Sequence, residues 1–287
     1  MHIQWFPGHM TKAMRMMEQS IKQVDCIIYV LDCRAVRSSL NPTFDKMIGT
    51  KPTLYVLNKR DLVEERLVKE WLEVFKKDGK QAIAVSSVGG KERNQIIDKI
   101  KVLNNEVIQK FAQKGANKIV RAMVVGVPNT GKSTLINSIC RSKKTITGNR
   151  PGVTRGKQWV GIAEGIELLD TPGSLPPAFE DQERAKYLAF VGSIKEDILH
   201  IDELALEMIE FCRERNITAF CERYKMDEFL SDNIEIFDQV AKVRGVVKTR
   251  SGYDYDRVAK IIVDDFKKGK FGKIMLDLPF IDYETKA

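Results

Sequence analysis

Short apolar runs bounded by turn-forming residues alternate along the first half of the chain with segments of helical periodicity. The apolar runs cover residues 26–31, 53–57, 82–85, 121–127 and 166–169. Between them, residues 64–77 and 92–114 repeat apolar positions at helical spacing. Continuous apolar strands separated by helices are typical of a parallel sheet that is buried on both faces. The pattern therefore predicts a doubly wound α/β sheet, to which residues 159–163 add an antiparallel strand.

The pattern changes after the proline-containing segment at residues 174–177, because helical periodicity continues but the strand signal fades. The helical stretches there are residues 184–194, 203–213, 234–243 and 255–267. A chain of 287 residues is long enough for one sizeable core and a smaller second domain. We predict an α/β domain over residues 1–177 and a small all-helical domain over residues 178–287.

Composition narrows the class of protein without identifying it. Hydrophobic residues make up 43% of the chain and charged residues 30%, which is ordinary for a soluble globular protein. No apolar run approaches the roughly 18 residues that a membrane span needs, and the N-terminus MHIQWFPGHM is not of signal-peptide type. The five cysteines form no CxxC pair or metal-type spacing, so we expect free thiols in a cytoplasmic protein without a membrane partner.

The run GVPNTGKS at residues 126–133 fits the phosphate-binding pattern G-x-x-x-x-G-K-[ST]. An apolar run precedes it and a helical pattern follows it, which is the strand–loop–helix context that the motif requires. Lys132 would reach the β- and γ-phosphates, and Ser133 would bind Mg²⁺. The residues expected to contact the nucleotide in this loop are Asn129, Thr130, Gly131, Lys132, Ser133 and Thr134.

Two segments downstream of this loop have the spacing of GTPase switch regions. DTPG at residues 170–173 follows an apolar run, so Asp170 would hold the Mg²⁺ shell and the Gly173 N–H would sense the γ-phosphate. In RPGVTRG, Thr154 would complete the Mg²⁺ shell. DTPG or a loop threonine alone is a common structural feature, and the combination with the phosphate loop favours the functional interpretation.

The segment NKRD at residues 58–61 predicts guanine recognition. A carboxylate at Asp61 can accept hydrogen bonds from guanine N1–H and the exocyclic amine, which adenine does not offer at that edge. Asn58 would brace the loop, and Lys59 would lie along the base. Ser86 and Ser87, after the apolar run at residues 82–85, occupy the place of the loop whose backbone N–H contacts the guanine carbonyl, although a serine pair after a strand is usually only a turn.

These motifs occur in an unusual order, because the base motif at residues 58–61 precedes the phosphate loop at residues 126–133. In a Ras-like GTPase the phosphate loop comes first. The order predicts a circularly permuted Ras-like P-loop domain, in which the switch segments lie directly before the helical domain.

With these motifs the sequence resembles the circularly permuted GTPases, and most of all the ribosome biogenesis GTPase A (YlqF/RbgA) family. The resemblance extends over nearly the whole chain through QWFPGHM (4–10), LDCR (31–34), SSLNP (38–42), NKRD, GVPNTGKSTLIN, RPGVT, DTPG and KFGKI (270–274). It implies a bacterial GTPase that acts late in assembly of the large ribosomal subunit. The implied fold is a permuted GTPase domain followed by a helical, RNA-contacting domain.

The residue that orients the attacking water differs from the Ras pattern. Ser174 stands where Ras-like enzymes carry glutamine, and the resembling family has a hydrophobic residue there. The resemblance assigns the water-orienting role to His9 of WFPGHM, and an imidazole can bind a water near neutral pH. The helical pattern also predicts a helix over residues 9–21, so the alternatives are that His9 caps this helix or contacts an RNA phosphate.

The resemblance also implies a second ion, since Asn129 is the type of residue that helps to bind K⁺ beside the phosphates in such GTPases. The alternative is that asparagine simply suits a tight loop.

Positive charge is concentrated near the C-terminus. Residues 241–273 hold ten Lys or Arg against four Asp, a local net charge of +6 out of +8 for the whole chain. Such a patch is expected in a protein that binds the RNA backbone. Runs of charged residues, however, often only form the solvent-exposed face of a helix.

Together these features predict an Mg²⁺-dependent, K⁺-stimulated monomeric GTPase. It would bind the rRNA and proteins of an immature large ribosomal subunit and hydrolyse GTP to GDP and phosphate. DNA is not an expected partner. Two alternatives stay open: a permuted GTPase of small-subunit maturation, or a GTP-gated RNA-binding module with negligible catalysis, since the usual glutamine is absent.

Overall fold

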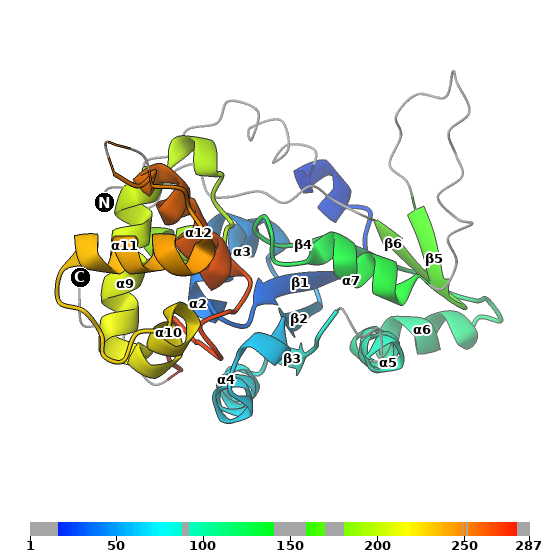
Figure 1. Cartoon of the computed structure of the whole chain (residues 1–287). Coiled ribbons are helices and arrows are strands. Elements are labelled where there is room, and N and C mark those ends of the chain that lie inside the picture. The colour runs from blue at the N-terminus through cyan, green and yellow to red at the C-terminus, as the bar shows by residue number, and fades with distance from the viewer. Residues whose placement is uncertain are drawn as a thin grey trace, which may run out of the picture. The chain divides into compact units, whose positions relative to one another are not determined.

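The computed structural model describes residues 17–87, 92–140, 159–169, 181–248, 250 and 252–279. Within them the α/β part is built on one sheet, shown in Figure 1. Its strands are β1 (Cys26–Asp32), β2 (Thr53–Asn58), β3 (Gln81–Ala84), β4 (Val120–Val125), β5 (Trp159–Ala163) and β6 (Ile166–Leu169).

The strand order across the sheet is β3-β2-β1-β4-β6-β5. Every neighbouring pair is parallel except β5, which runs antiparallel to β6. The predicted doubly wound parallel sheet with an antiparallel strand at residues 159–163 is therefore confirmed. Parallel pairing brings the carboxyl ends of β1, β2, β3, β4 and β6 to the same edge, where sheets of this class bind their ligands.

One face of the sheet is covered by α5 (Arg93–Leu103) and α7 (Lys132–Ile139). Aliphatic side chains from alternate strand positions, such as Ile28, pack there with Ile100 of α5 and Leu135 of α7. Side chains at successive strand positions point to opposite faces, so this alternation fixes which residues enter this layer.

An aromatic layer fills the opposite face, beneath α3 (Pro42–Ile48) and α4 (Glu65–Lys77). Phe44 of α3 packs edge-on against Tyr29 with ring centroids 5.9 Å apart, and Tyr29 stacks on Tyr55 at 5.6 Å. Tyr55 in turn lies 4.9 Å from Phe75 of α4. The sheet thus has helices on both faces, as the continuous apolar runs predict.

The helical stretch at residues 92–114 consists of two helices, because α5 ends at Leu103 and α6 (Asn105–Ala112) starts anew. The break lies at Asn104, whose backbone leaves the helical region at φ −109° and ψ 13°. The Asn104 side chain donates to the Ile100 carbonyl at 2.8 Å. Such a local bond competes with the helix ladder and favours a helix end at asparagine.

Among the described residues of 181–276 the regular elements are α-helices joined by loops, apart from an isolated bridge residue, Gly252, and a 3₁₀ turn, η2 (Glu196–Ile198). They are α8 (Gln182–Phe190), α9 (Ile201–Arg215), α10 (Ile217–Tyr224), α11 (Asn233–Arg244) and α12 (Tyr255–Lys267). Asp181, Asp232 and Asp254 cap the first turns of α8, α11 and α12 with their side chains. The all-helical second domain is confirmed, and α10 is an element that periodicity does not reveal.

Aromatic residues build the core of these helices. The rings of Phe190, Phe211 and Phe266 pack edge-to-face with centroids 5.2 to 6.2 Å apart, and Phe271 adds a further contact with Phe266 at 6.0 Å. Edge-to-face pairs of this kind stabilise a core beyond their buried area.

The described residues divide into an α/β unit, residues 17–169 with 277–279, and a helical unit, residues 181–276. The predicted boundary at residue 178 lies outside the described residues and stays a prediction. Asp277 belongs to the α/β unit: its carboxylate accepts from the backbone N–H and hydroxyl of Ser38 in α2 (Val36–Ser39) at 2.7 and 3.0 Å. The indole N–H of Trp71 donates to the Asp277 carbonyl at 2.9 Å. No helix in the described part of the chain is both long and apolar enough to cross a membrane.

Candidate functional site

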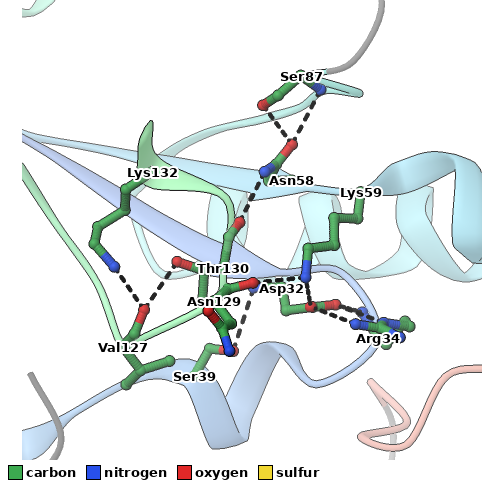
Figure 2. A network of polar contacts seen from close by, with 10 residues as sticks. All are labelled: Asp32, Arg34, Ser39, Asn58, Lys59, Ser87, Val127, Asn129, Thr130 and Lys132. Atoms are coloured by element: carbon green, nitrogen blue, oxygen red, sulfur yellow. Dashed lines mark hydrogen bonds and ion pairs between the residues drawn. The ribbon is translucent and has the colours of Figure 1, made fainter. Parts of the chain in front are cut away.

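The predicted nucleotide motifs meet at the carboxyl edge of the parallel strands. Asn58 ends β2, Ser86 and Ser87 follow β3, and residues 126–131 connect β4 to α7. Figure 2 shows Asn58, Lys59 and Ser87 beside the phosphate-loop residues Asn129, Thr130 and Lys132. Motifs that are far apart in the sequence, and in reversed order, thus form one cluster.

The phosphate loop passes so close to the sheet that its first glycine has no room for a side chain. Gly126 has φ 151°, and a Cβ built there would lie within 3.0 Å of the Val30 carbonyl of β1. A larger residue would have to displace the β1 backbone. This close approach explains the first fixed position of G-x-x-x-x-G-K-[ST].

Lys132 begins α7 and is almost fully buried, at 7% exposure. Its ammonium donates to the Val127 carbonyl at 2.7 Å, and the Thr130 hydroxyl donates to the same carbonyl at 3.1 Å. Ser133 and Thr134 are exposed in the first turn of α7. Backbone N–H groups at the start of a helix and an adjacent ammonium form an anion site, so this arrangement is suited to phosphate.

Asn58 joins the base motif to the phosphate loop. Its side-chain amide donates to the Thr130 carbonyl at 2.8 Å. Its carbonyl oxygen accepts from the hydroxyl and the backbone N–H of Ser87 at 2.7 and 3.2 Å. The predicted bracing role of Asn58 therefore has a geometric basis, since the residue ties together the loops after β2, β3 and β4.

Lys59 makes a second link between the two motifs. Its backbone is in the left-handed region at φ 61°. The ammonium donates to the Asn129 carbonyl at 2.7 Å and to the Asp32 carboxylate at 2.8 Å. Asn129 is itself left-handed at φ 60°. Two non-glycine residues in this sparsely populated region face each other, which is typical of a functional site.

Asp61 and Ser86 lie at the open side of the cluster. Asp61 is exposed in a short 3₁₀ turn, η1 (Arg60–Leu62), and its carboxylate accepts from the Ser86 hydroxyl at 2.7 Å. The backbone N–H of Ser86 donates to Glu92 at 3.4 Å. The structure thus brings the serine pair next to NKRD as predicted, and its contact with a guanine carbonyl stays a prediction.

Sequence reasoning gave no role to Asp32 and Arg34 of LDCR, although both lie in this cluster. Asp32 is fully buried at the end of β1, and Arg34 is 2% exposed. Burial disfavours the charged Asp32 carboxylate, but Arg34 and Lys59 outweigh it and hold the pKa of this carboxyl well below its usual range. The sequence signals were the position of LDCR at the end of the first apolar run and its place among the segments that carry the family resemblance.

Five of the predicted positions fall outside the described residues. They are His9, Thr154, Asp170, Gly173 and Ser174. Of the three expected Mg²⁺ ligands, only Ser133 is described, and the described residues contain no cluster of His, Cys, Asp or Glu that could hold a metal. The metal and water-orienting roles therefore stay predictions.

Comparison with known proteins supports the same assignment. A family model described as a 50S ribosome-binding GTPase matches residues 121–224. This match starts downstream of residues 58–61, in keeping with a chain whose base motif comes first.

Relatives match the chain nearly end to end. A ribosome biogenesis GTPase A from Bacillus cereus is 40% identical, over 97% of this chain and 95% of that protein. One from Priestia megaterium is 38% identical, over 97% of this chain and 98% of that protein. The crystal structure of GNP-bound YlqF from T. maritima has a TM-score of 0.67 at 27% identity, covering 94% of this chain and 99% of that chain. The chain therefore belongs to the ribosome biogenesis GTPase A family.

Proposed function

We propose that this protein binds an immature large ribosomal subunit in the cytoplasm as a monomer and hydrolyses GTP to GDP and phosphate late in assembly of that subunit. The observation that carries the nucleotide part is the joining of NKRD to the phosphate loop by the bonds of Asn58 to Thr130 and of Lys59 to Asn129. Membership in the family supports the ribosomal part.

The exposed Asp61 carboxylate would select guanine. It would accept from N1–H and the exocyclic amine, and Ser86 would hold it through the 2.7 Å hydroxyl bond. An adenine base would offer Asp61 neither of these two donors, and a carboxylate left without its base partners discriminates strongly between substrates.

The phosphates would lie at the start of α7, against Lys132. Ser133, Thr154 and Asp170 would hold Mg²⁺, which would neutralise charge on the phosphates, and the exposed position of Ser133 in the first turn fits this role. The Gly173 N–H would contact the γ-phosphate, and His9 would orient the attacking water in place of the missing glutamine.

Asn129 would contribute to a K⁺ site beside the phosphates. Its left-handed backbone, at φ 60°, supports a specialised role in the loop. The added positive charge would stabilise the transition state. Hydrolysis should therefore be faster in K⁺ than in Na⁺ at equal ionic strength, and equal rates would contradict this ion site.

The helical unit would contact rRNA through its basic residues. Seven of the ten Lys and Arg residues between positions 241 and 273 are exposed and, within the described chain, lack a carboxylate partner. They are Lys242, Lys248, Arg250, Arg257, Lys260, Lys270 and Lys273. Cations that are not neutralised internally are available to phosphates, and such binding weakens steeply as salt increases.

Co-sedimentation with purified large and small ribosomal subunits tests this proposal. We expect binding to large subunits in the presence of a non-hydrolysable GTP analogue, and weaker binding to small subunits. Changing Lys242 and Lys260 together to Ala should weaken binding and reduce its salt dependence. The matched control changes Lys69 and Lys77, two exposed lysines of α4, to Ala. Equal losses from both pairs, or a preference for small subunits, would contradict the proposal.

A further inference from the structure

Asp32 occupies a position from which it can act on the base motif. In the pairing of β1 with β2, its Cα partner is Asn58, the first residue of NKRD. The Cys33 N–H donates to the Asn58 carbonyl at 2.8 Å, which extends the pairing past the strand end. This register sets the Asp32 carboxylate beside Lys59, the residue after Asn58.

Four donors occupy the two oxygens of Asp32. Oδ1 accepts from the backbone N–H and Nε of Arg34, each at 3.0 Å. Oδ2 accepts from Arg34 Nη2 at 2.8 Å and from Lys59 Nζ at 2.8 Å. A buried carboxylate with these partners is held in one geometry. It is not placed to take up a proton or to bind a metal.

Lys59 distinguishes this cluster from a purely structural ion pair. Arg34 alone already gives Asp32 a bidentate partner, yet Asp32 also binds a lysine whose ammonium reaches the phosphate loop (Figure 2). The Lys59 side chain is 25% exposed. A partly exposed lysine loses considerable rotamer freedom when it is held. Asp32 therefore restricts Lys59 to the rotamer in which it contacts Asn129.

We propose that Asp32 is a positioning residue for guanine-nucleotide binding: Arg34 fixes its carboxylate, and the carboxylate fixes Lys59 between the base motif and the phosphate loop. Asp32 itself does not touch the nucleotide. This inference depends on one part of the proposed function, namely that the protein binds GTP or GDP.

A double-mutant cycle with a fluorescent GDP analogue tests this role. Asp32→Asn keeps the shape of the side chain and removes its charge, so GDP affinity should fall at least about tenfold. Lys59→Met removes the ammonium. If Asp32 acts through Lys59, Asp32→Asn should change affinity less than about twofold when Lys59 is already Met. Equal losses in both backgrounds, or no loss in either, would overturn the proposal.

Two controls keep the test decisive. Asp32→Asn leaves the Arg34 cation buried, so if the variant does not fold, the same cycle is measured in chains that carry Arg34→Met. Asp25→Asn removes another ion-paired aspartate, next to the opposite end of β1, where Asp25 pairs with Lys118 at 2.8 Å. It should leave GDP affinity unchanged. Wild-type protein that fails to bind GDP would contradict the proposed function, whereas binding with an additive cycle contradicts only the role of Asp32.

Discussion

Gly131 of the phosphate loop lies directly against the Asn58 side chain of the base motif. Its φ is 90°, and a Cβ built there would lie within 3.0 Å of the Asn58 amide nitrogen. Gly131→Ala should therefore force Asn58 away from its partners. Gly115 offers a matched control, because it also has positive φ, at 70°, but nothing lies within 4 Å of a Cβ built there.

The cost of Gly131→Ala has two parts. The positive φ costs about 1–2 kcal/mol for alanine, and Gly115→Ala should show this part alone. Displacement of Asn58 disturbs its bond to Thr130 and its two bonds from Ser87, each worth about 0.5–1.5 kcal/mol. Because some of these bonds can re-form with adjusted geometry, Gly131→Ala should destabilise the α/β unit by about 1–3 kcal/mol more than Gly115→Ala does.

Tryptophan fluorescence during heating reports the unfolding of the α/β unit, so it can measure this difference in stability between the two variants. Of the three tryptophans of the chain, Trp71 and Trp159 belong to the α/β unit, and Trp71 is buried there. At about 2–4 °C per kcal/mol for a unit of this size, the Tm of Gly131→Ala should lie about 2–12 °C below that of Gly115→Ala. GDP affinity should also fall only in Gly131→Ala. Equal Tm values and equal GDP affinities in the two variants would refute the interlock of Gly131 with Asn58.

Three further predictions follow from the site. Asp61→Asn should weaken GTP binding at least about 100-fold and improve XTP binding, because an amide can donate to the xanthine carbonyl; unchanged preference for GTP contradicts base reading by Asp61. His9→Ala should lose ribosome-stimulated turnover while GTP affinity is kept, and normal stimulated turnover would remove His9 from the mechanism. The Asp32 carboxylate has a lowered pKa in the folded state, so its stabilising contribution is full above its ordinary pKa of 3.8 and is lost as pH falls through the lowered value. The difference in urea midpoint between wild type and Asp32→Asn should shrink below pH 3.8, and a pH-independent difference would contradict the lowered pKa.

The sheet and the nucleotide motifs could be predicted because both are encoded locally. Apolar runs specify buried strands, and the nucleotide motifs lie at the carboxyl ends of those strands, where the chain leaves the sheet. The reversed order of NKRD and GVPNTGKS does not alter this, since parallel pairing brings the strand ends to one edge. The doubly wound fold was therefore accessible from the sequence alone.

Features that depend on register or on distant partners could not be predicted. The contact of Asp32 with Lys59 requires the pairing of Asp32 with Asn58 across two strands. Asp277 is 239 residues from Ser38 along the chain, and no local pattern links them. The helix break at Asn104 coincides with a side-chain bond to the Ile100 carbonyl that helical periodicity does not reveal. In the first two cases tertiary geometry, rather than local propensity, decides the outcome, and at Asn104 a local side-chain bond does.

Phosphate release measured with and without purified ribosomal subunits tests the central claim most directly. A permuted GTPase of large-subunit assembly should release phosphate slowly alone in Mg²⁺ and K⁺, and faster when immature large subunits are added. Small subunits should have little effect. A rate that neither subunit changes, or that only small subunits increase, would contradict the claim.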